Sequence, residues 1–337
     1  MSIPLNPRAI VEIAGERFDS FTNTKLFKSV DVELTANESS QATWKIFDEG
    51  RKLLNQYALP EGIAQMDISV WLGFGDDLGA PIFTGLVANA ESEDDTTTFE
   101  FYDKGYLMRR VKRTTYHKGL DDLGVIAKLV RANGLKFEGP DKAIKLDKHK
   151  SLIQDEQTDW EHARERADEA GLILYVRGDT VYAKEAAKTG EPKLIVNFAT
   201  DTNLLHGSSF RYRAPENQDG TPKSVETRGR RLRGRSNVNA RGTEQLEIKR
   251  DLAIKSKRHA DRRAQARKEL QREHAFTGRL GLLPITRDMV LDTRATVEIR
   301  NRGILFNGRY LTGVTSHTFA PGQLQSELNV YSDANFH

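Results

Sequence analysis

Short segments in which apolar and polar residues alternate lie near both ends of the chain, and they limit the possible folds more than any other feature. Val30, Val32 and Leu34 alternate with acidic residues, and residues 66–72 show a similar alternation. A period of two places successive side chains on opposite faces of a β-strand. Because turn residues separate such segments, we expect residues 1–105 to form a first small antiparallel β-barrel.

The alternation returns in the last third of the chain. Apolar residues recur at every second position in residues 294–300, and a similar pattern runs through residues 324–331. We therefore expect residues 191–337 to form a second β-barrel. Two segments interrupt its strands, an Arg-rich loop at 228–243 and a charged helix at 255–275.

The middle of the chain, residues 106–190, carries helical patterns between short strands. Its best-defined helix starts at Thr158, which forms a Thr-x-x-Glu capping box with Glu161. Trp160 and several alanines recur at helical spacing and give a narrow apolar face. Gly171 stands at the helix end, where a left-handed residue is favoured. We expect a middle α/β module in which these four residues are structural.

Two hairpins in the predicted barrels share a pattern. Thr84 begins a Thr-Gly pair and precedes Tyr102 by 18 residues, and Thr312 begins another and precedes Tyr331 by 19. Two unrelated hairpins can also look alike, so the repeat has two interpretations. If the repeat is real, the fold is mainly β with an α/β insert, in which two related small antiparallel barrels flank the middle module.

Composition excludes several classes of protein. The chain has no cysteine, so it forms no disulfide and no thiolate metal site, which fits a reducing cytoplasm. No apolar run is long enough to span a membrane, and residues 1–17 lack the apolar core of a signal peptide. With 38% hydrophobic and 29% charged residues, the composition is that of a soluble globular protein.

Positive charge is concentrated in one segment. Residues 228–272 contain 16 Lys or Arg against five Asp or Glu, whereas the net charge of the whole chain is +3. Arginine is suited to bidentate contacts with carboxylates and phosphates. This segment could contact an acidic protein, bind nucleic acid or form a solvated loop. The candidate partner-contact residues are Arg228, Arg230, Arg231, Arg233 and Arg235.

No pattern in the chain indicates an enzyme. There is no Gly-x-Ser-x-Gly motif, no glycine-rich phosphate loop and no His-x-x-x-His pair. Asp76, Asp77, Asp121 and Asp122 are interpreted as solvated loop or helix-start acids. We expect no catalytic, cofactor-binding or metal site, and we expect the histidines to lie on the surface or in turns. The eight are His117, His149, His162, His206, His259, His274, His317 and His337.

Two segments carry a resemblance to a known family. The first is "LIQDEQTDWEHARERADEAGLILYV" (152–176) and the second is "NGRYLTGVTSHTFAPGQLQSELNVYS" (307–332), with His317 at the position of the family's histidine. The chain resembles the tail hub proteins of contractile-tailed bacteriophages, the late-control D family, which is related to the N-terminal part of the type VI secretion protein VgrG. The resemblance spans nearly the whole chain, apart from the Arg-rich loop.

The resemblance implies a structural role. Hub proteins of this kind are homotrimers in which each chain supplies two similar barrels, so that three chains form a pseudo-sixfold ring. Such a ring joins a hexameric tail tube protein to a trimeric central spike protein, contacts other baseplate proteins and lets DNA pass through its lumen without specific binding. The expected location is the virion tail baseplate, assembled in the cytoplasm of the bacterial host.

Nucleic-acid binding through residues 228–272 is the alternative function. Phosphate contacts would make such binding strongly salt-dependent. The segment contains no aromatic residue on which bases could stack, and Phe276 lies just beyond it. A cell-wall hydrolase is a third possibility, but the chain shows no paired-carboxylate motif and no spare domain for one.

Overall fold

The structure is a computed structural model. It describes residues 6–36, 38–57, 66–76, 78–185, 189–205, 207–212 and 276–332, and only the backbone of residues 225–226 and 233–234. The predicted charged helix (255–275) lies outside the described residues. So does the predicted Arg-rich loop (228–243), apart from the backbone of 233–234.

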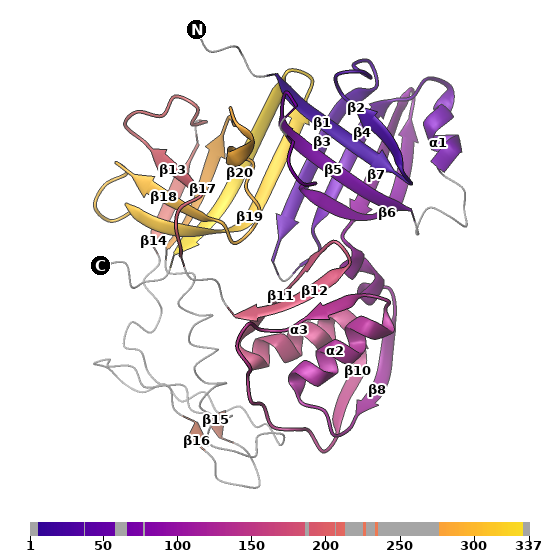
Figure 1. Ribbon diagram of the computed structural model, residues 1–337, viewed down its shortest axis with the longest axis vertical. Coiled ribbons are helices and arrows are strands. Elements are labelled where there is room, and N and C mark those ends of the chain that lie inside the picture. Colours follow the sequence, from indigo (N-terminus) through magenta and orange to yellow (C-terminus); the bar gives the residue numbers. More distant parts are fainter. Residues whose placement is uncertain are drawn as a thin grey trace.

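The fold is mainly β with a small α/β region, as predicted. In Figure 1 two β regions lie side by side above the α/β region. The N-terminal β region contains β1 (Pro7–Ile13), β2 (Glu16–Asp19), β3 (Phe27–Thr35), β4 (Gln41–Phe47), η1 (Glu49–Arg51), α1 (Lys52–Tyr57), β5 (Asp67–Phe74), β6 (Phe83–Glu93) and β7 (Thr96–Tyr102). The C-terminal β region contains β13 (Leu194–Asn197), β14 (Ser209–Tyr212), β17 (Phe276–Leu282), η4 (Arg287–Met289), β18 (Thr296–Arg300), β19 (Gly308–Ala320) and β20 (Gln323–Ser332).

The two β regions share a single 13-stranded sheet. Its main order is β14-β17-β20-β19-β3-β4-β7-β6-β5-β1-β2, and β18 pairs with β19 and β13 beside this path. Strand β19 joins the regions because its second half pairs antiparallel with β3, from Val314 opposite Thr35 to Phe319 opposite Val30. Closed barrels were predicted, but no ring of hydrogen-bonded strands closes in the described part of the chain. The β3–β19 pairing instead makes the two strand sets continuous.

Each β region has the same strand order. The N-terminal order β1-β5-β6-β7-β4-β3 corresponds, strand by strand and in chain order, to β13-β18-β19-β20-β17-β14. Every corresponding pairing is antiparallel except that of the first strand, because β13 runs parallel to β18 whereas β1 runs antiparallel to β5. The repetition inferred from two hairpins therefore extends to six strands.

The register of the strands sets the equivalence of individual residues. Leu86 lies opposite Tyr102 in β7, and Leu311 lies opposite Tyr331 in β20. These leucines also lie opposite the first residues of β5 and β18. Leu86 and Leu311 are therefore equivalent. The two Thr-Gly pairs used to align the hairpins in the sequence are not equivalent, since they differ by three residues in this register.

The core of the N-terminal region extends into the C-terminal one. It is built on fully buried aromatic residues, with Trp44 and Phe99 stacked at 5.9 Å between ring centroids. Phe319, near the tip of the β19–β20 hairpin, belongs to the same cluster and contacts Phe27 edge-on at 6.3 Å. Aliphatic and aromatic burial of this kind is the main favourable contribution to folding. The cluster therefore connects the two β regions through side chains as well as through backbone pairing.

The α/β region packs two helices against short strands. Helices α2 and α3 bury a common apolar cluster with β11 and β12, whose hairpin pairs with β9, while β10 pairs with β8. The bounds are η3 (Lys104–Arg109), β8 (Lys112–His117), α2 (Asp122–Ala132), β9 (Lys136–Glu138), β10 (Leu152–Thr158), α3 (Asp159–Ala170), β11 (Leu172–Arg177) and β12 (Thr180–Glu185). The two-residue strands β15 (Val225–Glu226) and β16 (Arg233–Gly234) pair with each other.

Candidate functional site

Helix α3 is capped at both ends by its own sequence. The Thr158 hydroxyl accepts a hydrogen bond from the Glu161 amide at 3.1 Å, and the Glu161 carboxylate accepts one from the Thr158 amide at 2.8 Å. The same carboxylate also accepts a hydrogen bond from the Thr158 hydroxyl at 2.9 Å. The two bonds that it accepts, from the Thr158 amide and from the Thr158 hydroxyl, lower the pKa of Glu161. Gly171 follows the last turn with φ 72°, and its amide donates back to the helix. The caps fix where α3 begins and ends, and so they place Trp160.

Trp160 helps to join the α/β region to the N-terminal sheet. Its side chain is buried, and the Arg109 guanidinium stacks 4.0 Å from its ring centroid. The same guanidinium donates to the Ser39 hydroxyl at 2.5 Å and lies 3.7 Å from the Asp103 carboxylate. Burial raises the pKa of Asp103, and the charge of Arg109 opposes that rise. The arginine is thus held between an aromatic face and a carboxylate.

Two further arginines cross between regions. Arg177, at the end of β11, binds both oxygens of Asp292 and donates to the Thr293 hydroxyl at 2.6 Å, which joins the α/β region to the C-terminal strands. Arg287, in η4, donates to the Leu78 carbonyl at 3.0 Å and joins the two β regions. We call Arg109, Arg177 and Arg287 the joint arginines. No local pattern identifies them in the sequence, because the partner across each joint lies on a distant segment, namely Ser39 for Arg109, Asp292 for Arg177 and Leu78 for Arg287.

The histidines were predicted to lie on the surface or in turns, and this is wrong for the four that are described. His117, His149, His162 and His317 are each at most 1% exposed. Each makes a hydrogen bond to a buried or half-buried group, which offsets the cost of removing a polar ring from water. The other four lie outside the described residues.

A buried polar cluster occupies the inside of the α/β region. His149 Nε2 lies 2.8 Å from Asp122 Oδ1, and Arg166 approaches the same oxygen at 3.5 Å. His162 stacks on His117 at 5.4 Å. Burial, assisted by the charge of Arg166, lowers the pKa of His162 to about 4. Asp122 was interpreted as a solvated helix-start acid, but its side chain is completely buried.

Asp121 and Asp76 lie where the sequence predicted, at a helix start and on the solvent-exposed surface. Asp121 is the N-cap of α2 and accepts from the Gly124 amide at 2.8 Å. Asp76 is exposed and pairs with Arg8 at 2.7 Å. Asp77 lies outside the described residues. No group of three His, Cys, Asp or Glu side chains that could hold a metal ion exists among the residues that the structure describes.

His317 and Ser326 are opposite each other in the β19–β20 hairpin. His317 Nδ1 lies 2.6 Å from Ser326 Oγ, and Nε2 donates to the Leu291 carbonyl at 2.8 Å. The serine therefore donates to Nδ1, and the ring is neutral; burial lowers the pKa of His317 to about 4. A catalytic serine must be reachable by substrate, but Ser326 is 2% exposed and His317 fully buried. We interpret the pair as structural.

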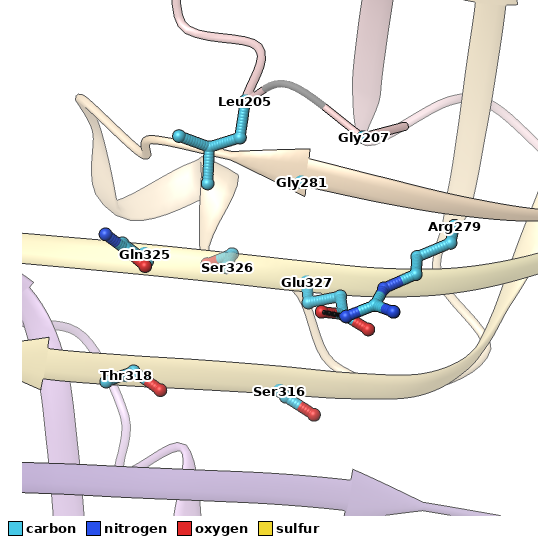
Figure 2. Close-up of a pocket in the computed structure, with 9 residues that line it drawn as sticks. All are labelled: Leu205, Gly207, Arg279, Gly281, Ser316, Thr318, Gln325, Ser326 and Glu327. Carbon is cyan, nitrogen blue, oxygen red and sulfur yellow. Dashed lines mark hydrogen bonds and ion pairs between the residues drawn. The ribbon is translucent and has the colours of Figure 1, made fainter. Parts of the chain in front are cut away.

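Figure 2 shows a polar hollow of about 390 Å³ on the C-terminal strands. The Arg279 guanidinium from β17 and the Glu327 carboxylate from β20 form an ion pair in it. Ser316 of β19 lies beside Glu327, and Thr318 lies farther along β19, opposite Gln325. The lining residues are Leu205, Gly207, Arg279, Gly281, Ser316, Thr318, Gln325, Ser326 and Glu327. Hydroxyl and amide groups with one satisfied ion pair make a hydrated surface rather than a reactive centre.

The candidate partner-contact residues cannot be placed in this geometry. Arg228, Arg230, Arg231 and Arg235 lie outside the described residues, and of Arg233 only the backbone in β16 is described. No helix among the described residues is long and apolar enough to span a membrane. The described features are therefore structural joints and polar surfaces.

Solved tail proteins have the same fold. A tail protein from Neisseria meningitidis MC58 is 15% identical, with a TM-score of 0.70 over 97% of each chain. The 43 kDa tail protein of prophage MuSo2 from Shewanella oneidensis is 10% identical, with a TM-score of 0.65 over 96% of this chain and 97% of that one.

A third match comes from a secretion system. It is an E. coli type VI secretion component described as similar to the T4 tail proteins gp27 and gp5. It is 9% identical, with a TM-score of 0.60 over 92% of this chain and 74% of that one. The predicted resemblance to phage tail and type VI proteins is thus confirmed for the fold.

A family model also matches more than half of the chain. Residues 9–207 match the model described as the Alg8 N-terminal domain, and the chain belongs to this family. The match runs from β1 through β13 and ends before β14. No curated protein matches the chain.

Proposed function

We propose that the protein is a structural hub of a phage-type tail baseplate. It would act as a homotrimer whose pseudo-sixfold ring joins a hexameric tail tube protein to a trimeric central spike protein. One observation carries this proposal, namely that a six-strand order occurs twice in one chain. The shared fold with solved tail proteins supports it independently.

The repeat gives a physical reason for such a role. A cyclic trimer presents three equivalent surfaces, whereas a hexameric tube presents six. A chain that contains two similar β regions supplies six similar regions from three copies. The same trimer keeps strict threefold symmetry wherever only one element per chain is exposed, as in the α/β region. One molecule can then match both kinds of partner.

The division of the chain follows from this proposal. Residues 1–105 and 191–337 would be the two ring-forming domains, and residues 106–190 would brace them. The joint arginines support a rigid brace, because a guanidinium held in two or more contacts resists bending. The role is non-enzymatic, the location is the virion tail, and other baseplate proteins are further partners.

The polar face of the sheet would border the lumen through which DNA passes. Asp31 and Glu33 of β3 and Glu91 of β6 lie on it together with Ser316 and Thr318 of β19. The positive charge of Arg279 on this face is paired with Glu327. Acidic and hydroxyl side chains repel or merely hydrate a phosphate backbone, so DNA would pass without specific binding. Residues Arg228, Arg230, Arg231, Arg233 and Arg235 would contact an acidic face of a neighbouring tail protein.

Mass photometry of the purified chain, alone and with its spike protein, tests the hub. We expect a particle of three times the 38.0 kDa chain mass. Cryo-EM averages viewed down the axis should show six similar densities. A chain that stays monomeric at micromolar concentration, both alone and with the spike protein, would contradict the proposed function.

The concentrated charge of residues 228–272 keeps nucleic-acid binding as a second candidate. An electrophoretic shift with double-stranded DNA at low salt tests it. Binding should weaken steeply as salt rises and should be lost when Arg230, Arg231, Arg233 and Arg235 are replaced by serine. If the unmodified protein causes no electrophoretic shift of DNA at low salt, nucleic-acid binding is rejected as a function.

A further inference from the structure

The β3–β19 pairing joins two equivalent β regions within one chain. Its register can serve as a template for strand pairing between two copies of the chain. Strand β3 is the end strand of the N-terminal set, and it pairs with the second half of β19, beyond the part of β19 that pairs with β18. The C-terminal counterpart of β3 is β14, and the N-terminal counterpart of β19 is β6. These counterparts do not pair with each other within the chain.

Each counterpart has one edge that, along part or all of its length, pairs with no other strand in the described part of the chain. Strand β6 pairs with β5 only from Phe83 to Leu86, whereas it pairs with β7 from Leu86 to its last residue, Glu93. Beyond Val87 its outer side has no strand partner in the described residues. At the other end of the molecule, β14 is the last strand of the sheet in the described part of the chain. An unpaired edge offers backbone donors and acceptors to another strand.

The register of the template predicts which residues would meet. Within the chain, Ser316 lies opposite Glu33. The equivalence of Leu311 with Leu86 makes Ser316 equivalent to Glu91. The pairings of β3 with β4 and of β14 with β17 make Glu33 equivalent to Arg211. The same register places Glu93 opposite Ser209 and Ala90 opposite Tyr212.

The charges at these positions are complementary. Glu91 and Glu93 are exposed on β6, and Arg211 is exposed on β14. An acid and a base directly opposite each other in antiparallel strands attract, whereas like charges repel. The register was taken from the pair of Ser316 and Glu33, in which only one residue is charged. The register was therefore chosen without reference to opposite charges. The match of Glu91 with Arg211 is therefore an independent observation.

The two edges also lie on opposite sides of the molecule. In Figure 1, β14 is at the left of the sheet and β6 at the right. Two different surfaces on opposite sides make a head-to-tail contact, which produces a closed ring when the rotation per copy is right and an open filament otherwise. A second copy of this chain is the partner that such surfaces fit.

We propose that residues 88–93 of β6 pair antiparallel with β14 of the next copy, with Glu91 opposite the next copy's Arg211. The inference rests on the proposed trimeric ring and specifies the contact that closes it. The β6–β7 hairpin is two residue pairs shorter than β19–β20 between the bulge and the turn, so it has no counterpart of Phe319. The contact between copies is therefore weaker than the internal joint.

Disulfide trapping tests the register directly, because the chain has no cysteine of its own. The double variant Glu91→Cys/Arg211→Cys should give covalent dimers and trimers on a non-reducing gel after mild oxidation, since opposite residues bring Cβ atoms within disulfide range. The matched control is Glu91→Cys/Thr277→Cys, in which the second cysteine lies one strand inward on β17. The control should stay monomeric on the gel.

Charge exchange tests the same contact without oxidation. Glu91→Arg and Arg211→Glu should each raise the dissociation constant of the assembly about tenfold or more, and the double exchange should restore it. Glu100→Arg makes the same charge change on β7, which has strand partners within the chain on both sides, and it should have little effect.

The outcomes separate this contact from the proposed function. If mass photometry shows a trimer but no cross-link forms between residues 91 and 211, the proposed β6–β14 contact is wrong and the proposed hub function stands. Cross-linked open filaments support the contact and contradict the closed ring. A protein that neither assembles nor cross-links at 100-fold the concentration used for mass photometry overturns both.

Discussion

At the residue scale, the four described histidines behave as core residues. Some of their partners are distant in sequence, such as Asp122 for His149 and the Leu291 carbonyl for His317. A sequence shows the residue type but not this partner, so a histidine between polar neighbours is read as exposed. Burial lowers the pKa of His162 and of His317 to about 4, so both rings are neutral at neutral pH. Neutral buried rings make the stability of the fold depend on pH.

We predict that His317 makes the protein less stable as the pH falls. Its folded pKa of about 4 lies below the ordinary 6.5, so between these values the unfolded chain binds more protons than the folded one. The contribution is complete above about pH 6.5 and is lost as the pH falls toward 4, on the order of 3 kcal/mol in all. His317→Gln should therefore destabilise the protein more at pH 7 than at pH 4.5, as measured by urea unfolding.

The control for His317 is Phe319→Leu, which changes another buried side chain of β19 that does not titrate. It should reduce the free energy of unfolding by about 1 kcal/mol at both pH values. A cost of His317→Gln that is also independent of pH would contradict a neutral buried ring.

At the scale of elements, helix α3 could be predicted at both ends because its signals are local. The Thr158–Glu161 box and Gly171 determine the caps within one helical turn. The hairpins were predicted as elements, but their alignment was not. The Thr-Gly pairs suggested one register, whereas strand pairing makes Leu86 and Leu311 equivalent. The bulges lie at equivalent positions, but β19–β20 has two more residue pairs between its bulge and its turn, so spacing along the chain does not give the alignment.

The two Thr-Gly glycines should respond differently to alanine. A Cβ on Gly85 would lie 2.2 Å from the Tyr102 carbonyl oxygen, a backbone atom that cannot move aside, whereas on Gly313 it would lie 3.2 Å from the Tyr331 ring. Gly85→Ala should lower the free energy of unfolding by about 3 kcal/mol, and Gly313→Ala by about 1 kcal/mol or less. Urea unfolding measures both. Equal costs would mean that the close approach at Gly85 is absent.

At the scale of the whole molecule, the sequence could indicate two β regions but not how they join. The pairing of β3 with β19 connects residues such as Thr35 and Val314, which are far apart in the chain. Register between such strands depends on side chains from both regions, so it has no local signal. The same is true of the joint arginines. Only the complete fold shows that the α/β region contacts both β regions.

The joints between regions lead to the last prediction. Arg177→Lys keeps the charge but loses the two-pronged contact with Asp292, because an ammonium group cannot bind both carboxylate oxygens in the same fixed geometry. Since both side chains are partly exposed, we expect a loss of only about 1 kcal/mol. That loss should appear as faster hydrogen exchange in β11 and β12, while β3 and β4 stay protected.

Lys136→Ala provides the matched control for this joint, since it removes an ion pair with Asp179 that lies inside the α/β region. Lys136→Ala should leave the rate of hydrogen exchange unchanged where the α/β region meets the C-terminal strands. If Arg177→Lys also leaves that boundary unchanged, then the brace does not depend on this arginine. The link between the α/β region and the C-terminal strands would then come mainly from Arg294, whose guanidinium donates to the Glu185 carbonyl and stacks on Tyr175. The double variant Arg177→Lys/Arg294→Lys would measure that share directly.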